Sequence, residues 1–440
     1  MAGTLDLNLQ RGLGVYYLLV ALMNIGFGLY YQRAAIPRRQ GLATFWYAVA
    51  GLFAFHALGY GVFQAGWVIP EHIRRTVDRF ADPISYTLLS VGVFVVVLVW
   101  RRFFTNPHVA WGILMLSLLV GGWSFTDPNF RAIVAKEDNV PITMLIYSVA
   151  FFTWLGLYRS VQNDDRIARG EPVLEKLDDE KVLVWPDLVY TELICMVIAT
   201  LVLVVWSILL KAPLEQPATS AKAPNPSKAP WYFLGLQEML VYFDPWMAGV
   251  VMPTLIMIGL IALPYIDFNR EGSGYYTFVQ RKFAITVYLF GFLVLWVVLI
   301  VLGTFLRGPN WNFFAPFEYW DPHKVLPLNN INISDLFWLR LMGTSPSTVT
   351  FPGYRDSQFL NVVWRELPGL LLVLAYLVVL PPLLAATVFR KFFVKMGLLR
   401  YFIMINLLLF MAALPIKMIL RWSPLNLKYI VAMPEYFFNI

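Results

Sequence analysis

A short run near the middle of the chain, KAPWYFLGLQEML at residues 228–240, gathers side chains that could handle a proton. The aromatic run Trp231–Phe233 follows Pro230 directly, and the carboxylate of Glu238 comes a few residues later. A phenol such as Tyr232 can donate a hydrogen bond, and a carboxylate can take a proton from a hydroxyl within hydrogen-bond reach. The spacing sets a limit, because residues 230 and 238 of one helix lie about 12 Å apart along its axis.

Two further carboxylates, Asp187 and Glu192, lie at and just inside the beginning of an apolar stretch. Ionisable groups within a membrane are costly and commonly mark a functional path, so both are candidate functional residues. The structural alternatives are that Asp187 caps the helix that begins there and that Glu192 hydrogen-bonds to a neighbouring helix.

The sequence offers few metal ligands. Cys195 is the only cysteine, which excludes an intrachain disulfide, a CxxCH haem attachment and an all-cysteine iron–sulfur site. Haem b in membranes is held by histidine pairs on facing helices, but of four histidines only His56 lies well inside an apolar stretch. We therefore expect no metal site, and we interpret His56 as a hydrogen-bonded core residue.

The composition is typical of a membrane protein. The 440 residues are 59% hydrophobic and 14% charged, whereas about a quarter of the residues in a soluble domain are charged. The 16 Trp and 22 Tyr suit the membrane interface, where an apolar ring with one polar atom is favoured. The net charge of +7 does not indicate a nucleic-acid partner, because the basic residues are scattered over short loops and form no patch.

Ten apolar stretches of roughly 20 residues predict transmembrane helices and hence an all-α, polytopic fold. They are 13–31, 43–67, 84–100, 109–125, 141–158, 188–210, 246–266, 283–306, 367–389 and 401–420. The run WYFLGLQEMLVYF lacks proline and predicts a short surface helix in the loop before the seventh stretch. The density of Lys and Arg in short loops places residues 160–185 in the cytoplasm. Both termini and residues 228–240 are then expected on the outer side.

The middle third of the chain resembles a known family. WPDLVY at 185–190 opens a span, a proline-rich loop and PWYF follow, and the next spans are interrupted by MP at 252–253 and PYID at 264–267. This order is similar to the C-terminal half of cytochrome b in split form, as in subunit IV of the cytochrome b–f complex and in bacterial cytochrome bc complexes. The likeness covers about residues 183–325.

This resemblance divides the chain into four parts. Residues 1–160 form a five-helix membrane module of unassigned role, and residues 161–185 form a charged cytoplasmic linker. Residues 186–325 form the domain similar to the C-terminal half of cytochrome b. Residues 326–440 add an outer loop and a two-helix extension.

The resemblance implies a subunit of a quinol:cytochrome c oxidoreductase, inactive alone, in a bacterial cytoplasmic membrane. In that family the outer loop forms one wall of the quinol oxidation site, and transmembrane electron transfer is coupled to proton release outside. The implied substrate is menaquinol or ubiquinol at a shared site. Haem b and a Rieske iron–sulfur cluster would belong to partner chains, and no cofactor would be bound covalently. The implied partners are a haem-binding N-terminal half of cytochrome b, a Rieske protein, a c-type cytochrome and lipid, in a dimeric complex.

The family motif is Pro-Glu-Trp-Tyr, and Ala229, Pro230, Trp231 and Tyr232 stand at its four positions. Pro230 cannot accept a proton as the family's glutamate is proposed to do. We therefore predict that Glu238 is the proton acceptor and that Tyr232 hydrogen-bonds near the quinol.

The quinone-binding set implied by the resemblance is Pro230, Trp231, Tyr232 and Phe233. On the opposite side, where the family takes up protons at its quinone reduction site, Asp187 and Glu192 are candidates for the uptake path. Because the motif glutamate is missing, a non-catalytic structural subunit with a cytochrome b-like fold is the alternative. A secondary transporter is less favoured, since the chain lacks inverted repeats and paired broken helices.

Overall fold

The computed structural model describes residues 5–34, 39–178, 180–210, 212, 214, 216–326 and 330–440. For Ala34 it describes the backbone alone. Within these residues nine helices are long and apolar enough to cross a membrane. They are Leu7–Arg33 with α1 (Leu7–Leu29), α2 (Gln40–Gly61), α6 (Pro107–Ser124), α8 (Asn139–Ala168), Val184–Leu209 with α9 (Val189–Leu209), Met247–Ile266 with α11 (Met252–Ile266), Lys282–Leu306 with α12 (Lys282–Leu289) and α13 (Val298–Val301), Leu367–Ala386 with α15 (Leu367–Leu374) and α16 (Leu380–Ala386), and α18 (Leu398–Trp422). The predicted all-α polytopic fold is confirmed.

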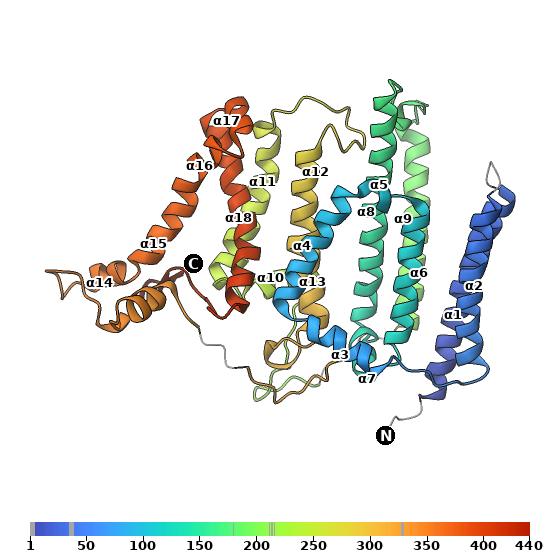
Figure 1. Ribbon diagram of the computed structural model, residues 1–440, viewed down its shortest axis with the longest axis horizontal. Coiled ribbons are helices and arrows are strands. Elements are labelled where there is room, and N and C mark those ends of the chain that lie inside the picture. Colours follow the sequence, from blue (N-terminus) through green and yellow to red (C-terminus); the bar gives the residue numbers. More distant parts are fainter. Residues whose placement is uncertain are drawn as a thin grey trace.

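A bent helix pair accounts for the tenth predicted span. Helix α3 (Glu71–Phe80) meets α4 (Pro83–Val99) at 86°. Asp82 caps α4, because its Oδ1 accepts hydrogen bonds from the backbone amides of Ile84 at 2.9 Å and Ser85 at 3.1 Å. Pro83 suits the first helical position, where no amide donor is needed. The bend leaves α3 lying across the lower end of the helices (Figure 1).

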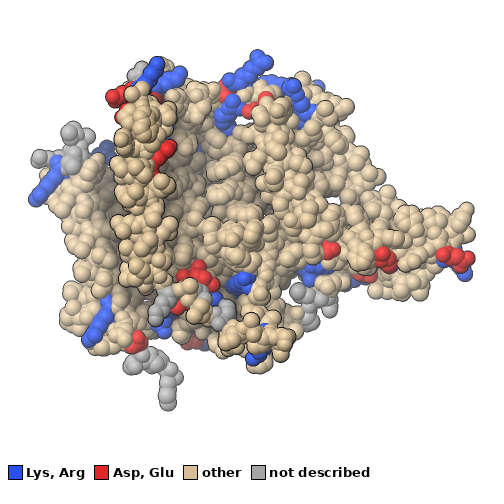
Figure 2. Space-filling view, turned by 180° about the vertical axis from the view of Figure 1, so that it is seen from behind, with Lys and Arg blue, Asp and Glu red and all other residues tan. Residues whose placement is uncertain are grey.

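The spanning helices stand side by side, with their ends gathered at two faces (Figure 1). The linker at 160–178, the loop at 267–281 and α17 (Arg390–Met396) lie at the upper face. Helices α3, α7 (Pro128–Val134) and α10 (Trp231–Met239) lie at the lower face. Most Lys, Arg, Asp and Glu side chains also gather at these two faces, with an uncharged band between them (Figure 2). This separation is the pattern that a hydrocarbon layer requires. Which face is cytoplasmic stays a prediction.

The apolar core consists of several clusters, of which two are the largest. One cluster lies among α1, α2 and α6 and contains Tyr17 and Phe53. A second lies around α10, α11 and α18 and contains Tyr242. Helix α4 joins the second group, since the ring of Tyr86 packs on that cluster and its hydroxyl donates to the carbonyl of Val298 at 3.3 Å. The domain boundaries stay a prediction, and within residues 1–160 both α4 and α8 pack against the later helices, since Leu98 and Leu157 share a cluster with Phe278.

The remaining short elements cover the ends of the helices. Helix α5 (Arg101–Phe104) connects α4 to α6, and α14 (Gln358–Arg365) precedes α15. Strands β1 (Ala432–Met433) and β2 (Phe438–Asn439) pair antiparallel in the C-terminal tail. Helix α9 differs from the other spans because none of its residues is buried. Its whole surface is therefore available to lipid or to another chain.

Candidate functional site

Helix α10 carries the sequence run described first, and the predicted surface helix is confirmed. Pro230 directly precedes the first helical residue, and its own backbone is not helical. Its lack of an amide N–H therefore costs no helical hydrogen bond. Leu234, Glu238 and Met239 are buried along one side of α10, which packs against α13. The helix therefore turns its only carboxylate towards the protein interior.

The first turn of α10 faces outward. Trp231, Tyr232 and Phe233 are 40%, 47% and 52% exposed, and Pro230 is also exposed. The rings of Trp231 and Tyr232 meet edge to face with centroids 5.7 Å apart, and those of Tyr232 and Phe233 are 4.6 Å apart. Pro230, Trp231, Tyr232 and Phe233, which we call the aromatic turn, form an apolar surface that carries one phenol, that of Tyr232. The structure thus brings the predicted quinone-binding residues together.

Glu238 lies apart from the aromatic turn, in a buried ion pair with Arg307. Glu238 is fully buried and Arg307 is 1% exposed. Arginine Nε donates to Oε2 at 2.9 Å and a terminal nitrogen donates to Oε1 at 2.6 Å, the two-bond geometry that guanidinium and carboxylate favour. The indole of Trp311 donates to Oε2 at 3.1 Å, and the hydroxyl of Tyr242 donates to Oε1 at 2.8 Å. Each carboxylate oxygen therefore accepts two hydrogen bonds.

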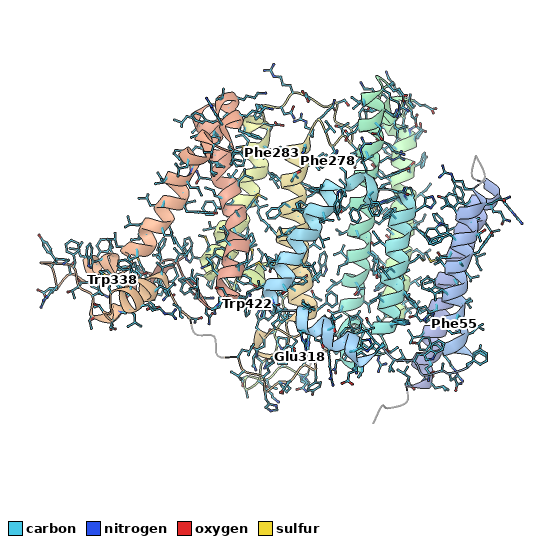
Figure 3. All side chains as sticks on the ribbon, in the orientation of Figure 1. Phe55, Phe278, Phe283, Glu318, Trp338 and Trp422 are labelled. Carbon is cyan, nitrogen blue, oxygen red and sulfur yellow. The ribbon has the colours of Figure 1, made fainter. Side chains whose placement is uncertain are left out.

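A second set of contacts fixes the donors around Glu238. The indole of Trp422, at the lower end of α18 (Figure 3), donates to the hydroxyl of Tyr242 at 3.1 Å. The same indole lies under the guanidinium of Arg307, 5.0 Å from its ring centroid. Burial, with Glu238 nearby, raises the pKa of Tyr242 well above its ordinary value, so this phenol stays protonated and donates. The ion pair thereby ties together α10, α18 and the segment after residue 306.

This geometry gives Glu238 a structural task that the sequence did not reveal. Removing one partner of a buried ion pair costs about 3–5 kcal/mol, because the other charge is left unpaired. The prediction that Glu238 accepts a quinol proton stays a prediction, and both its oxygens are already engaged. Sequence reasoning missed Arg307, Tyr242 and Trp311. The available signals were an arginine directly after a 25-residue apolar helix and a tyrosine one helical turn after Glu238.

Side-chain clamps hold the loop before the aromatic turn. Gln237 accepts a hydrogen bond from the backbone amide of Ala229 and donates one to the carbonyl of Ser227, both at 2.8 Å. Between these clamped residues, the ammonium of Lys228 donates to the carbonyl of Thr304 at 2.7 Å and lies 4.8 Å from the ring centroid of Trp320. Burial lowers the pKa of Lys228 to about 7, since desolvation disfavours the ammonium form. Near pH 7 the side chain of Lys228, two residues before the aromatic turn, is therefore present both as ammonium and as neutral amine.

The predicted proton-uptake residues lie at the opposite face. Asp187 and Glu192 are both exposed. Asp187 lies in the segment Val184–Leu188 just before α9, and Glu192 lies in the first turn of α9. The backbone carbonyl of Asp187 accepts a hydrogen bond from Thr191 at 2.9 Å. The structure therefore separates these carboxylates from the site around α10 by the length of α9.

The histidines are not arranged as a metal centre. His56 is buried, and its Nδ1 lies 2.8 Å from the carbonyl of Leu52, as expected for a core histidine. Across the residues that the structure describes, no three His, Cys, Asp or Glu side chains converge to hold a metal ion.

Comparison with known proteins places the site inside a recognised segment. Residues 217–315 match the family model described as cytochrome b (C-terminal)/b6/petD. No curated protein and no solved structure matches the chain. The matched segment contains the aromatic turn, Lys228 and both partners of the Glu238–Arg307 pair. The part of the chain that carries the candidate site is therefore similar to the C-terminal half of cytochrome b, and the resemblance predicted from the sequence is confirmed there.

Proposed function

We propose that this chain is a membrane subunit of a cytochrome bc-type complex and forms one wall of a quinol oxidation site. The carrying observation is the aromatic turn, which lies within the segment matched to cytochrome b and is exposed at one end of the helices. An apolar, ring-lined surface suits the flat apolar ring of a quinol. Because this surface is open on the chain itself, a partner subunit supplies the facing wall.

In this proposal the residues around α10 divide the work. The hydroxyl of Tyr232 hydrogen-bonds to the quinol, and Pro230, Trp231 and Phe233 contact its ring. The Glu238–Arg307 pair holds α10 in place, so that the aromatic turn keeps its position while the quinol enters and leaves. Glu238 as the proton acceptor remains the second possibility for this residue, and it requires the ion pair to open.

Haem b does not fit this chain, because its iron is held by histidines on two facing helices and the described spans bury one histidine, His56. We assign haem b and the Rieske cluster to partner chains, namely an N-terminal half of cytochrome b and a Rieske protein. A c-type cytochrome accepts the electrons. The substrate is menaquinol or ubiquinol, and the assembly is dimeric.

The opposite face has a separate proposed role. Asp187 and Glu192 lie at the end of the helices remote from the aromatic turn, where they take up protons for a quinone reduction site. In a bacterial cytoplasmic membrane the aromatic turn and both termini are then on the outer side. The unburied surface of α9 meets lipid or the haem-binding partner.

A reductase assay on the purified complex tests the proposal. Tyr232→Ala is expected to lower the rate of quinol-dependent cytochrome c reduction at least tenfold, because it removes a ring and a hydrogen-bond donor from the site. Tyr319→Ala serves as the matched control, since Tyr319 is 67% exposed in an outer loop. Equal rates for both variants and the unmodified complex would reject the proposed site.

A purely structural subunit is the second candidate. Proline at residue 230 and the full engagement of Glu238 favour it, because neither residue then offers a free carboxylate. A quinol-site inhibitor separates the two functions. The catalytic subunit predicts that the inhibitor stops turnover and that Tyr232 variants change its affinity, whereas the structural subunit predicts unchanged affinity.

A further inference from the structure

Lys228 is held in place on both its backbone and its side chain. Gln237 hydrogen-bonds to the residues on both sides of Lys228, which fixes its backbone. Its side chain runs inward, where the ammonium bonds to the carbonyl of Thr304 and faces the ring of Trp320. A lysine on a protein surface ordinarily extends its ammonium group into water and avoids the cost of desolvation. The burial of the Lys228 ammonium therefore indicates a functional role.

Two buried polar atoms beside Lys228 have no hydrogen-bond partner within the described part of the chain. They are the hydroxyl oxygen of Thr304, a residue only 1% exposed, and the indole nitrogen of Trp320. Buried polar groups are nearly always hydrogen-bonded, so unpaired ones point to a bound water or ligand. Lys228 itself has three donors, and one of them reaches the carbonyl of Thr304. The surroundings of the Lys228 ammonium therefore have spare hydrogen-bonding capacity.

The charged groups that face Lys228 form two ion pairs, and within each pair the two effects on its pKa oppose each other. Lys136 and Asp138, before α8, form an ion pair at 3.2 Å. Glu238 of α10 pairs with Arg307. Each pair contributes one charge that favours the ammonium of Lys228 and one that opposes it. Burial is therefore the dominant influence, and a pKa of about 7 leaves comparable amounts of amine and ammonium near neutral pH.

We propose that Lys228 is the group that accepts a proton from the quinol at the aromatic turn. Lys228 lies two residues before Pro230, so its backbone is within about 7 Å of the position where the related motif carries a carboxylate. In the step, one quinol O–H bond breaks as an N–H bond forms on the neutral amine, and one electron passes to an acceptor on a partner chain. The ammonium releases its proton to outer water, and the regenerated amine accepts the second proton as the second electron leaves to another one-electron acceptor on a partner chain. This inference rests on the proposed function and adds the proton acceptor that Pro230 cannot be.

The test compares three variants of the assembled complex across about pH 6–9, with quinol-dependent cytochrome c reduction as the readout. Lys228→Gln keeps a donor for the carbonyl of Thr304 but has no basic nitrogen. Lys228→Arg keeps the charge and cannot release its proton in this range. Lys222→Gln is the matched control, because Lys222 is an exposed lysine of the same loop.

For the unmodified complex relative to Lys228→Gln, we expect the rate ratio to rise about tenfold between pH 6 and pH 8, as the amine form replaces the ammonium. At the upper end of the range Lys228→Gln is expected to be at least about 100-fold slower, the usual contribution of a general base. Lys228→Arg is expected to be slow at every pH, and Lys222→Gln to follow the unmodified complex. Rates are expressed per assembled complex, measured by its haem content.

A rate ratio that does not change with pH, or a Lys228→Arg variant as fast as the unmodified complex, would overturn the assignment of Lys228. Either result leaves the proposed function intact, because the unmodified complex still oxidises quinol. A complex without quinol oxidation at any pH would instead reject the proposed function. Addition of a small primary amine to Lys228→Ala provides a second check, since rescue that grows with amine concentration requires a proton acceptor at this place.

Discussion

Replacing Glu238 with glutamine separates its structural role from a role in proton transfer. The change removes the negative charge that pairs with Arg307, which is 1% exposed. Tyr242 and Trp311 lose a charged acceptor at the same time. Breaking a buried pair from one side costs about 3–5 kcal/mol, so we expect the free energy of unfolding of this part of the complex to fall by that amount.

The control for this change is Glu318→Gln. Glu318 pairs with Lys324 at 2.6 Å near the protein surface (Figure 3), where an ion pair contributes about 0–1 kcal/mol. A double variant, Glu238→Leu with Arg307→Met, removes both buried charges. It is expected to recover most of the stability, because apolar replacements for a buried ion pair are often tolerated.

Thermal unfolding of the purified complex and its quinol oxidation rate are measured on the same samples. If Glu238→Gln unfolds at the same temperature as the unmodified complex but oxidises quinol slowly, the structural account is wrong. Glu238 would then be the proton acceptor predicted from the sequence. Loss of stability in the single variant with recovery in the double variant supports the ion pair as the anchor of α10.

Three further predictions concern the neighbourhood of α10 and the tail. Tyr232→Phe is expected to slow quinol oxidation without changing assembly, because Tyr232 is 47% exposed and the change removes only its hydroxyl; an unchanged rate would contradict this. Gln237→Leu leaves the amide of Ala229 unpaired at a cost of about 1–3 kcal/mol, so hydrogen exchange at residues 227–230 should rise, and unchanged exchange would refute the clamp. Hydrogen bonds from Arg365 lower the pKa of Glu435. Their contribution is therefore present above the ordinary carboxyl pKa and is lost as the pH falls through the lowered value. Proteolysis of the tail should increase over that acidic interval, and by less in Glu435→Gln.

The spans could be predicted because lipid imposes a simple local rule. A run of about 20 apolar residues must be a helix, and this rule located all ten stretches, including α4 with its capping Asp82. Helix α10 followed from the absence of proline in its run. These elements depend on neighbouring residues alone.

The interior of the site could not be predicted, because its contacts are distant in sequence. Arg307 lies 69 positions after Glu238, and Trp422 approaches Tyr242 from 180 positions away. No local pattern links an arginine at the end of one span to a carboxylate on an earlier helix. Spacing correctly placed Glu238 away from residue 230, but the burial of Lys228 beside Trp320 depends on how a later loop folds back.

The most direct test of the central claim is the optical spectrum of the complex purified through a tag on this chain. The account predicts that b-type haem copurifies and that added menaquinol or ubiquinol reduces it, with an iron–sulfur signal of the Rieske type in the same preparation. A preparation that contains neither b-type haem nor a Rieske centre would contradict the account.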